Sequence, residues 1–227
     1  TRAEVEPELF ERLVAWTYEL TGIETWVARA YSSVFWLLGA VFLFLIVREQ
    51  VSDAAALGSA GYFLLWPYAV IASRSFQPDV LMIMLIMAFL WLFSRWVKME
   101  SWGWAIAAGA VGGLAILVKF TAAFFVAGGA LGFGLAAYGP RLLGRRQTWL
   151  MIILGATPAA GYLYYGVVLR GFLGRQFGGR FIPELLLRPL NYIHWMEMAN
   201  LAAGGFAIAL GLLGLVVVRQ GLLRGAL

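Results

Sequence analysis

The stretch ASRSFQPDVLMIMLIMAFLWLF, residues 72–93, sets three strongly polar side chains directly before a long apolar run. Arg74, Gln77 and Asp79 precede fourteen apolar residues, Val80 to Phe93. An ionised side chain at the centre of a bilayer costs roughly 2.5 to 3.5 kcal/mol on insertion scales. The three polar groups are therefore expected at a water interface or inside a protein cavity, next to a membrane-spanning helix.

The composition is that of an integral membrane protein. Hydrophobic residues make up 62% of the 227 residues and charged residues 13%, with a mean hydropathy of +0.82. Soluble domains contain roughly 45–50% apolar and 25% charged residues. The absence of cysteine excludes disulfides and thiolate chemistry, and a single histidine excludes a multi-histidine metal site. The formal charge of +5 is scattered between apolar runs, as in proteins near anionic headgroups, and does not indicate nucleic-acid binding.

Seven apolar stretches bounded by charge predict an all-α, polytopic transmembrane bundle of about seven spans. A helix needs roughly 20 residues to cross a 30 Å hydrocarbon core. The region 103–138 exceeds one crossing, so a break is expected at Lys119. The expected spans are 30–47, 54–73, 80–97, 103–118, 120–138, 149–169 and 199–218.

Alternation of these spans divides the basic residues almost evenly between the two sides of the membrane. The short loops differ, because one contains RLLGRR, residues 141–146, whereas those of the opposite side carry only Arg74 and Lys119. Short loops carry most weight in the positive-inside rule, so RLLGRR is expected in the cytoplasm. The expected location of the protein is the plasma membrane, with several spans. Gln147 and Gln220 are then expected inside, and Gln77 and Asn191 outside.

The chain is expected to divide into four segments. ELFERLVAWTYELTG, residues 8–22, has apolar residues at helical spacing and predicts a helix lying in the interface. Glycines four residues apart, at 109 and 113 and at 128 and 132, predict close helix approach. The segments are an external interfacial helix in 1–28, a six-span bundle in 29–168, an external aromatic and basic segment in 169–198, and a last span with a cytoplasmic tail in 199–227.

Four stretches, in this order, resemble the membrane enzymes of glycosyltransferase family 39, the group of protein O-mannosyltransferases and aminoarabinose transferases of lipid A. WVARAYSSVFWLLGAVFLFLIVRE at 26–49 is similar to the family's second span, and ASRSFQPD at 72–79 to a short external loop. GGLAILVKFTA at 112–122 resembles a Gly-rich span that ends in lysine. LLLRPLNYIHWMEMANLAAGGFAIALGLLGLV at 185–216 is similar to an external aromatic segment and the following span in prokaryotic members.

The resemblance implies a GT-C type fold that uses a polyprenyl-phosphate sugar donor at the external membrane face and passes the sugar to an acceptor. It also implies that Thr1 lies in the first external loop, after a span that is missing, so that the chain is an incomplete enzyme. The family's acidic residue of that loop has no match here, although Glu4, Glu6 and Glu8 are nearby carboxylates. The chain as given is therefore expected to be inert by itself.

The chemistry of such a reaction selects candidate site residues. A lipid phosphate requires cationic donors at headgroup depth, and the acceptor requires a carboxylate. Asp79 is the candidate catalytic residue, and Gln77 and His194 are candidate cavity-lining residues. The phosphate-binding candidates are Arg74, Lys119 and Arg29. Each also has a structural alternative: interface anchoring for the basic residues, helix capping for Asp79 and an aromatic belt for His194.

Two other function classes remain open from the sequence. A non-catalytic accessory subunit of a larger membrane complex would account for the unmatched acid. A secondary transporter also places charges near spans, but here the charges sit at span ends, and no inverted repeat is evident. The sugar, the acceptor and any divalent metal cofactor are not readable from the sequence, and no metal site is predicted.

Overall fold

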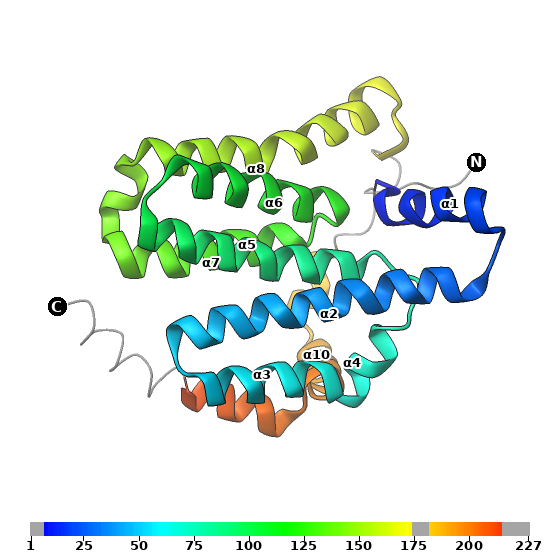
Figure 1. Ribbon diagram of the computed structural model, residues 1–227, viewed down its shortest axis with the longest axis horizontal. Coiled ribbons are helices and arrows are strands. Elements are labelled where there is room, and N and C mark those ends of the chain that lie inside the picture. The colour runs from blue at the N-terminus through cyan, green and yellow to red at the C-terminus, as the bar shows by residue number, and fades with distance from the viewer. Residues whose placement is uncertain (1–6, 174–181, 215–227) are drawn as a thin grey trace.

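The computed structural model describes residues 7–173 and 182–214, and every regular element within them is helical (Figure 1), which confirms the all-α class. Short helices are η1 (Gly139–Gly144), η2 (Tyr165–Leu169) and η3 (Pro183–Leu187). The α-helices are α1 (Leu9–Thr21), α2 (Thr25–Gln50), α3 (Asp53–Leu65), α4 (Pro67–Ala72), α5 (Asp79–Met99), α6 (Trp102–Val118), α7 (Ala122–Tyr138), α8 (Arg146–Tyr164) and α10 (Pro189–Ala203), followed by a helix over Gly205–Gly214.

Within the described residues, four helical segments are long and apolar enough to cross a membrane, so the expected number of seven spans is not confirmed. A bent pair, Pro189–Ala203 with Gly205–Gly214, would raise the number to five. Helix α6, with 17 residues, is shorter than the others. The four segments are Thr25–Gln50, Asp79–Met99, Ala122–Gly144 and Arg146–Leu169.

Two of the expected spans are interrupted, one at a proline and the other at a glycine. The region 54–73 breaks at Trp66, which is extended (φ −59°, ψ 134°), because Pro67 disfavours helical geometry in the residue before it and then begins α4. The region 199–218 crosses Gly204, whose φ of 74° allows the chain to bend by 88°. Neither α3 nor α4 is long enough to cross a membrane alone.

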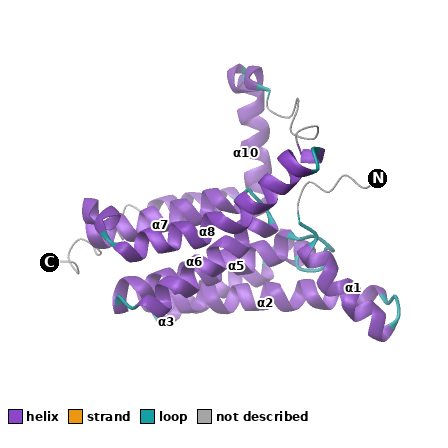
Figure 2. Ribbon diagram, turned by 90° about the horizontal axis from the view of Figure 1, so that it is seen from above, coloured by secondary structure: helices purple, strands orange, loops and turns teal. Residues whose placement is uncertain are grey.

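The long helices pack in a continuous order: α8 against α6, α6 against α5, α5 against α2, and α2 against α3, with α7 mainly on α5 (Figure 1). Helix α10 contacts α4 and η3 and stands away from this layer (Figure 2). Helices α5 and α6 follow each other in the chain and pack side by side, so the bundle has two polar ends where such helices are connected. We call them the Asp79 end, where α5 begins and α6 ends, and the Glu100 end, where α5 ends and α6 begins.

The apolar face of α1 packs on protein. Phe10 and Val14 are completely or almost completely buried, and the Phe10 ring lies 6.0 Å from the Phe35 ring of α2. The opposite edge of α1 leaves Trp16 and Leu20 largely exposed. An amphipathic helix at 8–22 was expected, and its apolar residues are divided between a contact with the bundle and an exposed edge.

Glycines bring α6 against α8. A Cβ added at Gly113 would lie 2.5 Å from the carbonyl oxygen of Leu154, and one at Gly109 would lie 2.9 Å from the Cα of Met151. These two glycines therefore make the predicted close approach. Gly128 and Gly132 of α7 have no atom within 4 Å of an added Cβ, so the same spacing does not produce close packing there within the described residues.

The Glu100 end is held by a network of polar contacts. Glu49 pairs with Lys98 at 2.8 Å, and Glu100 pairs with Arg145 at 2.8 Å. The hydrogen bond from Arg145 holds the pKa of Glu100 below its ordinary value of 4.5. The stability from this bond is therefore present above pH 4.5 and is lost as the pH falls through the lower, folded-state pKa.

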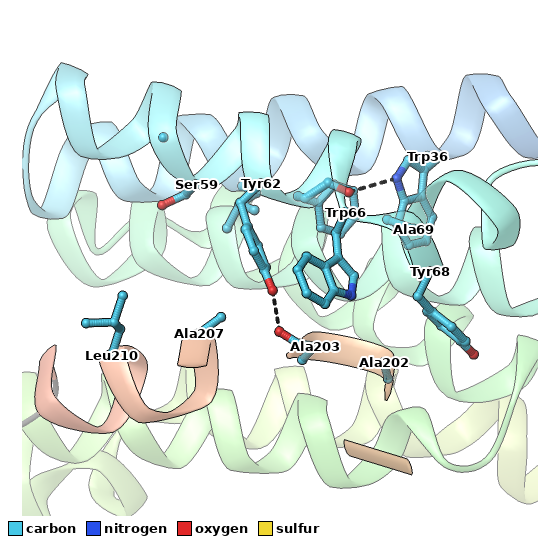
Figure 3. A pocket seen from close by; sticks show the side chains of 13 residues that line it. Trp36, Ser59, Tyr62, Trp66, Tyr68, Ala69, Ala202, Ala203, Ala207 and Leu210 are labelled. Carbon is cyan, nitrogen blue, oxygen red and sulfur yellow. Dashed lines mark hydrogen bonds between the residues drawn. The ribbon is translucent and has the colours of Figure 1, made fainter. Parts of the chain in front are cut away.

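An apolar groove of about 580 Å³ lies between α2, α3 and α4 on one side and the C-terminal helices on the other (Figure 3). Trp36 and Trp66 line one wall. The Tyr62 hydroxyl donates to the carbonyl of Ala203 across the groove. Gly204 packs on Trp66, since an added Cβ would lie 2.7 Å from the indole.

We expect Gly113→Ala to destabilise the protein by about 1–3 kcal/mol, because the new methyl group meets the backbone of α8, which cannot move away cheaply. The measurement is the unfolding free energy of the purified protein in detergent. Gly128→Ala is the matched control and should stay within about 1 kcal/mol of wild type, since its Cβ enters open space. Equal losses for the two variants would contradict this packing.

The orientation expected from the short loops gives a labelling prediction. Gln147 is buried and hydrogen-bonded to Trp96 and Glu100, so it is unsuited to labelling, and Gln220 lies outside the described residues. Gln77 and Gly144 are exposed at opposite ends of the bundle. We expect Gln77→Cys to react with an impermeant thiol reagent from outside and Gly144→Cys only after permeabilisation. Reaction of both from the same side would overturn the assignment.

Candidate functional site

Asp79 and Lys119 form a two-pronged ion pair at the Asp79 end of the bundle. The Lys119 Nζ lies 3.0 Å from both Asp79 carboxylate oxygens. Helices α5 and α6 are packed neighbours, which brings together residues that lie 40 positions apart in the chain. The side chains are 40% and 26% exposed, respectively, so the pair lies at the rim of the bundle and not in its core. The expected proximity of Lys119 to Asp79 is confirmed.

Helix geometry places each member of the pair. Helix α6 ends at Val118, and Lys119 is extended (φ −155°, ψ 123°), so the break expected at this position is confirmed. Lys119 therefore lies at the negative end of the α6 dipole, and Asp79 lies in the first turn of α5, at the positive end of the α5 dipole. Both charges are stabilised by the helices that carry them.

Asp79 is not the capping residue of α5. The residue at the N-cap position is Pro78, which has no side-chain donor or acceptor, and the α5 terminus has no side-chain capping bond. The carboxylate of Asp79 turns to Lys119 instead. The capping alternative considered from the sequence therefore does not describe this side chain.

Arg74 and Gln77 lie in the loop that precedes α5, and both side chains are exposed. The backbone N–H of Arg74 donates to Ile71, and that of Gln77 to Ser75. The guanidinium of Arg74 has no hydrogen-bond or ion-pair partner among the described residues. The shared cavity expected for these residues is not the groove of Figure 3, because none of Arg74, Gln77, Asp79 or Lys119 lines that groove.

The other two candidates, Arg29 and His194, do not contact the ion pair. Arg29 is exposed in the second turn of α2. His194 is exposed on α10, which packs on α4 and η3. Neither side chain makes a polar contact with Asp79 or Lys119 within the described part of the chain.

Two features of the Asp79 end were not predicted from the sequence. Ser32 and Ser33 of α2 hydrogen-bond the loop around Arg74, and the Ser-Ser step inside an apolar helix was the available signal. Aromatic rings also gather beside Lys119. The Phe120 ring lies 6.2 Å from the Tyr162 ring, which lies 6.3 Å from the Phe172 ring.

Across residues 7–173 and 182–214, no cluster of three or more Asp, Glu, His or Cys side chains could hold a metal ion. Glu8 directly precedes α1 and makes no capping bond. Glu4 and Glu6, the other candidates for the acid of the first loop, lie outside the described residues.

A double-mutant cycle should detect the ion pair. We expect Asp79→Asn and Lys119→Gln to be non-additive in unfolding free energy by about 0.2–1 kcal/mol, as for other partly exposed pairs. The measurement is denaturation in detergent. The control cycle combines Asp79→Asn with Arg29→Gln and should be additive. Additivity in both cycles would mean that the two charges do not interact.

Comparison with known proteins extends these observations. A family model described as dolichyl-phosphate-mannose-protein mannosyltransferase matches residues 6–165, well over half of the chain. The match includes the first three stretches on which the family resemblance rests, and the fourth lies beyond it. No curated protein and no solved structure matches the chain.

The matched region contains Arg74, Asp79 and Lys119, and with them the whole packed bundle from α1 to α8. Membership implies a membrane glycosyltransferase that uses a dolichyl-phosphate sugar donor. The chain belongs to the dolichyl-phosphate-mannose-protein mannosyltransferase family.

Proposed function

We propose that this chain forms part of an enzyme that transfers a sugar from a polyprenyl-phosphate carrier to an acceptor at the external face of the plasma membrane, with Asp79 and Lys119 at the centre of its site. The observation that carries the proposal is the bidentate pair between Lys119 and Asp79, close in the chain to the exposed Arg74, which is unpaired among the described residues. A carboxylate and two cations at the end of a membrane bundle match the charges of the reacting groups.

The reaction breaks the bond between the anomeric carbon of the sugar and the carrier phosphate oxygen. The acceptor oxygen forms the new bond to that carbon, and its proton passes to a base. The carrier leaves as a phosphate with additional negative charge, which cations at headgroup depth stabilise. In this assignment Asp79 accepts the proton, and Lys119 and Arg74 stabilise the phosphate.

Lys119 has enough N–H donors to bind Asp79 and a phosphate oxygen at the same time. An ammonium group has three N–H donors, and the two Asp79 oxygens occupy two directions around Nζ. The third can reach a phosphate oxygen. Arg74 offers a planar guanidinium that binds phosphate through two parallel hydrogen bonds.

In this proposal Arg29, Gln77 and His194 lie around the ion pair and make additional contacts with the substrates. Arg29 is at the same end of the bundle and is a candidate for a second contact with the phosphate. Gln77 and His194 are candidates for contacts with the sugar or acceptor. The carbonyl and hydroxyl groups of those ligands can form hydrogen bonds with such polar side chains.

The test is transfer of mannose from dolichyl phosphomannose by the full-length protein in lipid nanodiscs. We expect Asp79→Asn to reduce kcat by about 10²-fold or more, as for the loss of a general base, and Arg74→Gln to raise KM for the donor. Arg141→Gln is the matched control, because Arg141 is an exposed arginine at the opposite end.

Folded yield and melting temperature are measured for every variant, so that loss of activity is separated from loss of protein. Wild-type kinetics in both Asp79→Asn and Arg74→Gln would overturn the site assignment. A full-length protein with no transferase activity, together with its recovery in a stable membrane complex, would favour an accessory subunit instead.

A further inference from the structure

Two serines of α2 hold the backbone on either side of Arg74. The Ser32 hydroxyl donates to the Ser75 carbonyl at 2.8 Å, and the Ser33 hydroxyl donates to the Ser73 carbonyl at 3.3 Å. Ser73 and Ser75 are the immediate neighbours of Arg74 in the chain. The serines therefore act on this arginine through main-chain atoms.

The loop contact of Ser32 is not needed to satisfy its hydroxyl. Ser32 is fully buried and can donate to the Ala28 carbonyl of its own helix at 3.1 Å. The almost fully buried Ser94 makes just such a bond within its own helix, to Trp91 at 2.8 Å, and no other to the described residues. A hydroxyl has one hydrogen, and for Ser32 the shorter contact is the one that crosses to the loop.

The rest of the loop is anchored on both sides of this contact. The Phe76 ring packs 5.3 Å from the Phe10 ring of α1. The loop then continues into α5, whose first residue, Asp79, is held by Lys119. Among the described residues the Arg74 side chain has no polar partner, whereas contacts from α1, α2 and the Lys119 that follows α6 fix the backbone around it.

We propose that Ser32 and Ser33 are positioning residues that hold the Arg74 loop so that its guanidinium meets the carrier phosphate beside Lys119. The proposal rests on the phosphate-binding role of Arg74 given above. Fixing the peptide units next to Arg74 lowers the conformational entropy that the loop would otherwise lose when the phosphate binds. Removal of either hydroxyl leaves every charge in place and loosens only the backbone.

The first measurement does not depend on activity. A nitroxide attached to Gln77→Cys in this cysteine-free chain reports the mobility of the loop by electron paramagnetic resonance. We expect Ser32→Ala and Ser33→Ala to increase the mobility of the label, whereas Ser94→Ala, the control without a loop contact, leaves the spectrum unchanged. Unchanged spectra in both loop-contact variants overturn the proposal.

The second measurement is inhibition of the full-length protein by dolichyl phosphate, which probes the phosphate contact without the sugar. We expect each serine variant to raise the inhibition constant about fivefold, the effect of one lost hydrogen bond, with kcat nearly unchanged. In an Arg74→Gln background the same substitutions should have no further effect, because the serines act through Arg74. Ser33 is only half-buried, so Ser33→Ala remains informative if Ser32→Ala folds poorly.

The outcomes distinguish the positioning role of the serines from the phosphate-binding role of Arg74. If Arg74→Gln weakens inhibition and the serine variants do not, the positioning role is wrong and the site assignment stands. If Arg74→Gln itself leaves inhibition unchanged, the role of Arg74 is wrong and the positioning proposal falls with it. Serine effects of equal size in the wild-type and Arg74→Gln backgrounds would also overturn positioning.

Discussion

The exclusion of charge from the apolar interior governs this structure. Helix α5 begins with Asp79 and has its only basic residues, Arg95 and Lys98, in its last two turns, so the uncharged stretch between them sets the distance between the polar ends. All five ion pairs among the described residues lie at one end or the other. The apolar middle of the bundle cannot solvate charge, so the ion pairs form near the helix ends.

Helix contacts between those ends depend on shape. The glycines of α6 allow α8 to approach so closely that an added methyl group would meet its backbone, and Phe89 of α5 fills the space beside Gly112. Lys119 directly follows α6. The packing of α6 against α5 and α8 therefore determines the position of Lys119. As a result, changes that loosen this packing also change the geometry of the candidate site.

The Asp79 end and the Glu100 end have different characters. At the Glu100 end the acidic residues Glu49, Asp53 and Glu100 all form ion pairs with basic residues. Gln147 also bridges the Trp96 indole and the Glu100 carbonyl. At the Asp79 end Lys119 is paired, whereas Arg74 is exposed on a loop held through its main chain. An ion-pair network gives rigidity, whereas a cation on a fixed backbone, with no partner among the described residues, suits recognition of an external anion.

The sequence by itself determined the class of protein, because a composition of 62% hydrophobic residues leaves few folds other than a membrane helix bundle. It also located the break at Lys119 from span length, and the pairing of Gly109 and Gly113 with a close neighbour from their spacing. Helix lengths and small-residue patterns are local properties, so they can be read along the chain.

The tertiary structure decided what those residues contact. The same spacing at Gly128 and Gly132 faces open space, and the apolar run 54–73 is interrupted before Pro67. Asp79 could cap its helix or pair with a cation, and only the packing of α5 on α6 selects Lys119. The hydrogen bonds from Ser32 and Ser33 join residues about 40 positions apart, a separation that no local pattern specifies. Contacts between distant segments depend on how whole helices pack, and that information is distributed over many side chains.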